Sequence, residues 1–313
     1  MQFNTIEETM KNQRIKSQTS QRLISLVRKQ GFQMIEPDYF EDYDRFTHAH
    51  QRVTKQRIVK LMNPLGEVLV LRPDVTTSIA SKIVPLLKTE EELKLFYYAT
   101  TFNVGTQGKI ESRKQFGIEW FNAPNTAEKA VLALIVSIVE SLNLPYIIEL
   151  GSEEFLNTLI RQLELPKADE THLKTMIAYK DSSGLNTWLK TQSLPNTIRE
   201  VLEKLFSFRG CFNDLAKLID SQTFPEALSQ SLTELYQTMA SFQDQPLRFD
   251  LSMISEFEYY TGVRFKVYIE NVPKTVLKGG RYLAVNPYGH EEVSAIGFTM
   301  ESDALLKELI KNG

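Results

Sequence analysis

Residues 95–121 read LFYYATTFNVGTQGKIESRKQFGIEWF, and this stretch decides the fold. Two runs rich in aromatic residues, 95–102 and 113–121, have the composition of β-strands. The polar stretch 103–112 between them contains glycines at 105 and 108, as loops often do. The sequence therefore predicts a long antiparallel hairpin.

The second strand of this hairpin carries a small polar patch. With the two-residue period of a strand, Gln115, Gly117 and Glu119 lie on one face and apolar residues lie on the other. An amide and a carboxylate that flank a glycine form a small polar patch with room above it. An ordinary solvated sheet face over an apolar underside has the same pattern, so this strand alone leaves both interpretations open.

The segments around the hairpin mix helix and strand. Asp74 is expected to cap a helix, because its carboxylate can accept hydrogen bonds from the free N–H groups of a first turn. Hydrophobic spacing and turn residues predict, in chain order, a helix at 19–30, a strand at 32–36, a hairpin of 58–62 with 68–71, a helix after Asp74 that reaches Leu86, a helix at 126–142 and a strand at 146–150.

The middle of the chain has a different pattern. Between 152 and 243 strand patterns vanish, and short amphipathic helices are separated by prolines and glycines. Strand patterns resume at 247–251 and 263–269, and a helix follows at 301–311. We therefore expect an α+β core built from 1–150 and 244–313, with an inserted helical domain at 151–243.

Composition narrows the classes of function. The formal net charge of −3 gives no overall positive charge with which to bind a nucleic acid. The single cysteine, Cys211, excludes an intrachain disulfide, and the four histidines have no metal-ligand spacing. The first 20 residues lack the apolar core of a secretory signal, and no apolar run approaches the roughly 20 residues of a membrane span. We expect a cytoplasmic protein that binds no metal, membrane or nucleic acid.

Five segments, in order along the chain, resemble motifs of the class II aminoacyl-tRNA synthetases and specifically of the histidyl enzymes. These segments are Leu71-Arg72-Pro73-Asp74-Val75-Thr76, Gln115-Phe116-Gly117-Ile118-Glu119, Glu258-Tyr259-Tyr260-Thr261-Gly262, Lys278-Gly279-Gly280-Arg281-Tyr282 and Ala295-Ile296-Gly297-Phe298-Thr299-Met300. The third segment is the most specific. The resemblance implies a class II antiparallel sheet flanked by helices.

This resemblance also implies a pocket for an amino acid. The side-chain oxygens of the pocket suit the ammonium group and the imidazole of histidine as hydrogen-bond acceptors, and tyrosine rings can stack on the imidazole. The tyrosines also fit ordinary packing at a strand end. The expected histidine-binding residues are Asp74, Thr76, Gln115, Glu119, Tyr259, Tyr260 and Arg281.

Three arginines of the synthetase family are replaced. The resemblance implies that they stabilise the negative charge of ATP-dependent activation, and these positions read Asn103, Ser255 and Ala304. No basic residue occurs at 95–108, 249–263 or 301–306 to substitute for them. Since losing one strong transition-state donor costs about 2.7–4 kcal/mol, amino-acid activation is not expected.

A histidyl-synthetase-like core that keeps its pocket and loses these cations resembles the HisZ-type regulatory subunits of ATP phosphoribosyltransferase. The resemblance implies a hetero-octamer in which a short-form catalytic subunit needs the regulatory chain for activity and for feedback inhibition by histidine. It also implies homodimeric contacts, and no anticodon-binding domain is expected after the last strand. With no Gly-x-Gly-x-x-Gly or Walker loop, we expect no cofactor.

Two other interpretations stay open. A truncated histidyl-tRNA synthetase-like adenylating enzyme could use Lys109 or Arg113 in place of the lost arginines. A structural scaffold could carry a pocket that no longer binds anything. Exchange of pyrophosphate into ATP distinguishes an adenylating enzyme from a regulatory subunit. Histidine binding distinguishes a regulatory subunit from a structural scaffold.

Overall fold

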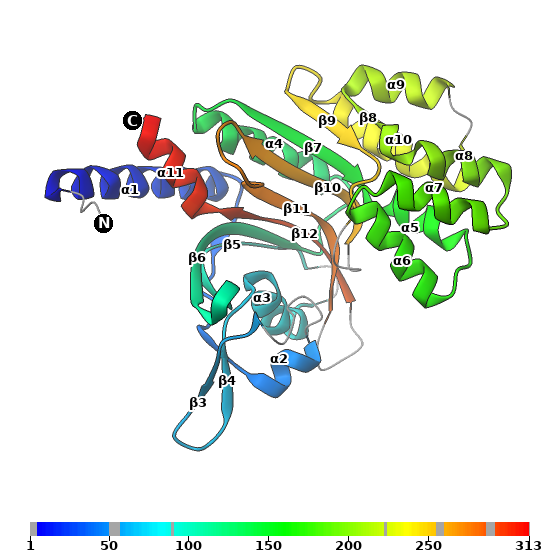
Figure 1. Ribbon diagram of the computed structural model, residues 1–313. Coiled ribbons are helices and arrows are strands. Elements are labelled where there is room, and N and C mark those ends of the chain that lie inside the picture. Colours follow the sequence, from blue (N-terminus) through cyan, green and yellow to red (C-terminus); the bar gives the residue numbers. More distant parts are fainter. Residues whose placement is uncertain are drawn as a thin grey trace. The chain divides into compact units, whose positions relative to one another are not determined.

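The computed structural model describes residues 5–49, 57–88, 91–221, 224–254, 260–285 and 292–312. Its mixture of helices and a large sheet confirms the α+β class. Contacts divide the chain into two compact units, Met1–Pro145 with Tyr268–Gly313, and Tyr146–Val267 (Figure 1). The sequence-based division, with 151–243 as an insertion, stays a prediction about domains. Each unit is described by itself below.

The first unit begins with the long helix α1 (Ile6–Lys29). The prediction that this helix starts near residue 19 was wrong, because Thr5 and Glu8 form a capping box at its start. The first half of α1 is mostly exposed, and only Leu23 and Val27 are buried, so hydrophobic spacing revealed only the second half. The predicted strand that follows is the two-residue β1 (Gln33–Met34).

The main sheet of this unit is built around the predicted hairpin. Its strands β5 (Leu93–Val104) and β6 (Ile110–Phe121) pair in antiparallel register. They extend beyond the predicted ends, so Asn103 lies in a strand and not in the loop. The strand order is β1, β5, β6, β12 (Glu292–Glu301) and β11 (Leu277–Val285), and only the β1–β5 pair is parallel.

The two faces of this sheet differ in what covers them. The face of Phe116 and Phe298 is apolar, and α1 and α4 (Ala127–Ser141) lie on it (Figure 1). The other face carries Gln115, Gly117 and Glu119, as the two-residue period predicts. Helix α3 (Val75–Ile83) contacts this sheet at β11, and α11 (Ser302–Asn312) contacts β6.

A small second sheet in the same unit is linked to α3 by a hydrogen bond from Ser78 to Glu41. Its strands lie in the order β2 (Phe40–Asp42), β4 (Val68–Leu71) and β3 (Lys60–Met62), which confirms the predicted hairpin. Together with α2 (Tyr43–Ala49) they bury Phe46, Ile58 and Val70. Asp74 caps α3 (Val75–Ile83), as predicted, but a 3₁₀ turn at Val84–Leu86 replaces the expected α-helical end, because Pro85 cannot donate a backbone hydrogen bond.

The second unit contains the predicted run of helices on a sheet of its own strands. Residues 260–267 of β10 (Tyr260–Ile269) belong to it, and the order is β10, β7 (Tyr146–Ser152), β9 (Leu247–Asp250) and β8 (Arg209–Gly210). The short β8 was not predicted. The helices are α5 (Glu153–Arg161), α6 (Lys167–Ala178), α7 (Ser182–Thr191), α8 (Asn196–Lys204), α9 (Phe212–Ser221) and α10 (Glu226–Ala240).

Within the described parts of the chain, we find no helix that is long and apolar enough to cross a membrane.

Candidate functional site

A buried carboxylate lies at the centre of the polar face of the first unit. Glu119 is 1% exposed and accepts a 2.6 Å hydrogen bond from the hydroxyl of Tyr282 on β11. A second pair lies beside it, where the Tyr97 hydroxyl is 2.7 Å from Oγ1 of Thr299. The patch predicted on β6 is therefore part of a buried polar group drawn from four strands, and the solvated-face interpretation does not apply to Glu119.

Two glycines allow these side chains to cross the sheet. A methyl group at Gly117 would overlap the Tyr97 hydroxyl, and one at Gly297 would overlap the Glu119 carboxylate. The space expected above Gly117 is therefore not open, because the Tyr97 ring from the neighbouring strand fills it. Any larger residue at either glycine would have to displace a side chain of the site.

The Tyr97 hydroxyl is buried and stays neutral. Burial raises its pKa well above the usual value of 10, and the negative charge of Glu119 raises it further. Hydrogen bonds to Thr299 and Thr76 act in the opposite direction and lower this pKa. Tyr97 therefore connects the sheet to Thr76, one of the predicted histidine-binding residues, on α3.

Asp74 has a structural role as the cap of α3. Its carboxylate accepts a 2.8 Å hydrogen bond from the backbone of Thr77 and another from the Thr77 hydroxyl, which fixes the first turn of α3. The preceding Arg72 is 1% exposed and donates to the carbonyls of Thr100, Pro37 and Asp38. The loop that carries Asp74 is thus held by buried hydrogen bonds.

Two further polar residues of the hairpin, Gln115 and Asn103, make specific contacts. Gln115 donates a 2.8 Å hydrogen bond to Glu301. Asn103, which stands where the synthetase family has an arginine, is 3.4 Å from the carbonyl of Pro73, next to Asp74. A neutral amide therefore occupies this position beside the site.

Arg281 is not brought together with these residues. It precedes Tyr282 on β11 and points to the opposite face, as the strand period requires. There its guanidinium donates to the Glu128 carboxylate, to Ser294 and to the carbonyls of Ala123 and Pro124. In this structure Arg281 connects the sheet to α4.

Tyr260 lies in the second unit, at the start of β10. Its ring is 4.6 Å from the guanidinium carbon of Arg264, and its carbonyl is 3.4 Å from the amide nitrogen of Asn157. Tyr259 and Ser255 lie outside the described residues. Ala304 lies within α11, and its side chain is likewise outside the description.

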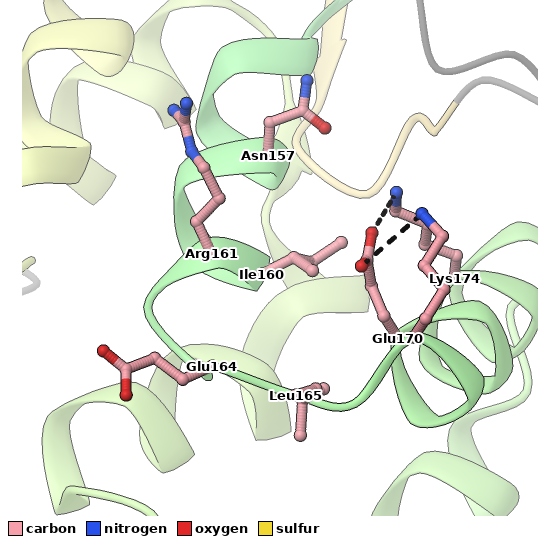
Figure 2. A pocket seen from close by; sticks show the side chains of 8 residues that line it. Asn157, Ile160, Arg161, Glu164, Leu165, Glu170 and Lys174 are labelled. Carbon is pink, nitrogen blue, oxygen red and sulfur yellow. Dashed lines mark ion pairs between the residues drawn. The ribbon is translucent and has the colours of Figure 1, made fainter.

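A separate cavity of about 340 Å³ lies between α5 and α6 (Figure 2). Its lining includes none of the predicted histidine-binding residues. Glu170 pairs with Lys174 at 2.5 Å and with Lys167 at 3.7 Å, and Arg161 pairs with Glu154 at 2.6 Å. Because carboxylates compensate these cations, the cavity is not a strong site for an anion.

Sequence reasoning missed Tyr97, Tyr282 and Thr299. Tyr282 and Thr299 lie in two of the five motif-like segments, and Tyr97 lies in the predicted hairpin, where its register opposite Gly117 was the signal. Among the residues that the structure describes, we find no cluster of three histidine, cysteine, aspartate or glutamate side chains suited to a metal ion.

Known proteins resemble this chain over most of its length. An ATP phosphoribosyltransferase regulatory subunit from Oceanobacillus iheyensis is 27% identical over 282 residues, which is 88% of this chain and 69% of that protein. A Bacillus halodurans structure described as an ATP phosphoribosyltransferase regulatory subunit/histidyl-tRNA synthetase superposes with a TM-score of 0.83 at 24% identity, covering 99% of this chain and 82% of that one.

A more distant structural relative is a chain of the ATP phosphoribosyl transferase (HisG:HisZ) complex from Thermotoga maritima. It has a TM-score of 0.68 and 17% identity, and the match covers 96% of this chain and 98% of that chain. These structural likenesses confirm the class II synthetase-like fold. The sequence profile described as histidyl-tRNA synthetase matches residues 7–305. The chain therefore belongs to the histidyl-tRNA synthetase family.

Proposed function

We propose that this chain is a non-catalytic regulatory subunit of ATP phosphoribosyltransferase. The observation that carries the proposal is the combination of a match to the histidyl-tRNA synthetase family over residues 7–305 with a neutral residue, Asn103, at a position where the family uses an arginine. The sequence relatives named as regulatory subunits, which match 88–93% of this chain, support the same conclusion.

The effector in this proposal is histidine, bound in the amino-acid pocket of the family. Glu119 offers a buried carboxylate to an imidazole N–H, with Tyr282 and Tyr97 as neighbouring hydroxyl groups. Asp74, Thr76 and Gln115 offer oxygen acceptors to the ammonium group, and Tyr259 and Tyr260 would contact the ring. Arg281 would support this pocket from the other face of the sheet.

The partner in this proposal is a short-form catalytic subunit that performs the phosphoribosyl transfer. We expect a hetero-octamer that also contains homodimeric contacts between copies of this chain, located in the cytoplasm. Histidine would bias the conformation of the partner. Because such coupling is reciprocal, the catalytic subunit and histidine should change each other's apparent affinity by the same factor.

The proposal is tested by calorimetric titration of histidine into the chain alone and into its mixture with a short-form catalytic subunit. We expect saturable binding whose affinity changes when the partner is present, and Glu119→Ala should weaken it. Absence of histidine binding in both titrations would favour the scaffold interpretation.

A second assay addresses the adenylating alternative. Pyrophosphate exchange into ATP should not respond to histidine, because Asn103, Ser255 and Ala304 replace cations that such a reaction needs. Restoring one of them in Asn103→Arg should not create exchange activity, since the other two positions stay neutral. Histidine-dependent exchange by the unaltered chain would identify an adenylating enzyme.

A further inference from the structure

The described residues on both sides of Tyr259 are anchored by contacts within the second unit. On the amino-terminal side, Asp250 and Ser252 are 7% and 1% exposed, and both bind the ammonium group of Lys180. On the carboxyl-terminal side, Tyr260 is contacted by Asn157 of α5 and by Arg264. These contacts lie within one compact unit.

The contact between Arg264 and Tyr260 depends on the glycine between them. The residues are four apart on β10, so their backbones are about 13 Å apart on the same face of the strand. Gly262 lies between them on that face and has no side chain. The guanidinium can therefore extend along the strand until it lies 4.6 Å from the Tyr260 ring centre, within the range of a cation–π contact.

The guanidinium of Arg264 is itself held by α5. Its Nη1 is 3.2 Å from the Glu153 carboxylate, and the two side chains are only 8% and 5% exposed. A second residue of α5, Asn157, binds the Tyr260 carbonyl. Helix α5 thus holds the backbone of Tyr260 directly and its ring through Arg264.

A contribution to the stability of the folded chain does not explain why Arg264 is buried between Glu153 and Tyr260. A buried ion pair is often no more stabilising than an apolar pair of similar volume. In addition, the buried Nε of Arg264 has no hydrogen-bond partner among the described residues, which carries a desolvation cost. Besides its ion pair with Glu153, the arginine contacts the ring of Tyr260, a residue of the histidine-specific motif.

We propose that Arg264 is a positioning residue for histidine recognition, which fixes the ring of Tyr260 and transmits the position of α5 to it through Glu153. The inference rests on the proposed function, because the ring position matters only if the chain binds histidine. It assigns a role to the second unit in sensing the effector.

The test uses the full chain with its short-form catalytic subunit and measures the histidine concentration that half-inhibits phosphoribosyl transfer. Arg264→Met should raise this concentration about tenfold. If Arg264 acts through the ring, the double variant with Tyr260→Leu should be no weaker than Tyr260→Leu alone. Arg264→Lys, which keeps the charge but lacks the planar guanidinium, should recover part of the affinity.

Arg161→Met is the matched control, because Arg161 forms an exposed ion pair with Glu154 on the same helix. It should leave histidine inhibition unchanged. Unaltered inhibition in Arg264→Met, or additive effects in the double variant, would overturn the positioning role. If Arg264→Met does not fold, Arg264→Lys decides by the same criteria. A wild-type chain that histidine does not inhibit would instead overturn the proposed function.

Discussion

Glu119 and Tyr282 are joined by a buried hydrogen bond although a whole strand separates them. Glu119 lies on β6, Tyr282 lies on β11, and β12 runs between them. Their side chains meet above Gly297, which faces Glu119 in the register of β6 and β12. The position of the carboxylate in the proposed pocket therefore depends on three strands at once, and a change in any of them should alter it.

Replacing Tyr282 by phenylalanine removes the hydroxyl that binds Glu119. We expect the free energy of unfolding to fall by about 1–3 kcal/mol, because a buried carboxylate loses a hydrogen-bond donor. Histidine affinity should fall as well. Urea unfolding and calorimetry measure the two effects. Tyr146→Phe, which loses a 2.7 Å bond to Gln245 in the second unit, is the control and should not change histidine affinity.

Replacing Gly117 by alanine introduces a methyl group where the Tyr97 hydroxyl and the backbone of Phe298 already lie. We expect a loss of about 1–3 kcal/mol in the free energy of unfolding, as for other overpacked sites. Gly105→Ala in the same hairpin meets only the flexible Glu111 side chain and should cost much less. Equal thermal midpoints for the two variants would contradict the close packing over Gly117.

The buried Tyr97 predicts a dependence of stability on alkaline pH. Its folded pKa is raised above 10, so its contribution is complete below pH 10 and is lost as the pH rises towards the folded value. In that window the unfolded chain releases a proton that the folded chain keeps. The loss should approach about 1.4 kcal/mol per pH unit. Urea unfolding of Tyr97→Phe should lack this component, and an unchanged pH slope would contradict it.

Replacing Arg281 by methionine separates a structural role from a role in binding histidine. We expect a loss of up to about 3–5 kcal/mol in the free energy of unfolding, because Glu128, whose side chain is 13% exposed, would be left as an uncompensated charge. Folded Arg281→Met should retain most of its histidine affinity. A variant of normal stability that fails to bind histidine would show instead that Arg281 reaches the ligand.

Much of the fold could be predicted from local patterns. The alternation in 113–121 located the polar face of β6, and the position of Asp74 before an apolar run located the start of α3. The start of α1 was not predicted from the sequence because the first half of the helix is exposed and has no buried stripe. Hydrophobic spacing reports burial, so it cannot detect a helix that is stabilised mainly by its cap and its own backbone.

The site was harder to predict than the fold because its contacts cross strands. Glu119 was identified from its own strand, but Tyr97 comes from the other strand of the hairpin, and Tyr282 lies 163 residues further along the sequence. Arg281 shows the opposite case, since its neighbour Tyr282 faces the site and the strand period turns the arginine away from it. A motif lists neighbours in sequence, whereas a pocket needs residues on one face.

The most direct test of the central claim is the rate of phosphoribosyl transfer by a short-form catalytic subunit as this chain and histidine are added. The regulatory account predicts that transfer requires this chain and that histidine suppresses it, with Glu119→Ala relieving the suppression. Transfer that proceeds equally well without the chain, or that histidine leaves unchanged in its presence, would contradict the account.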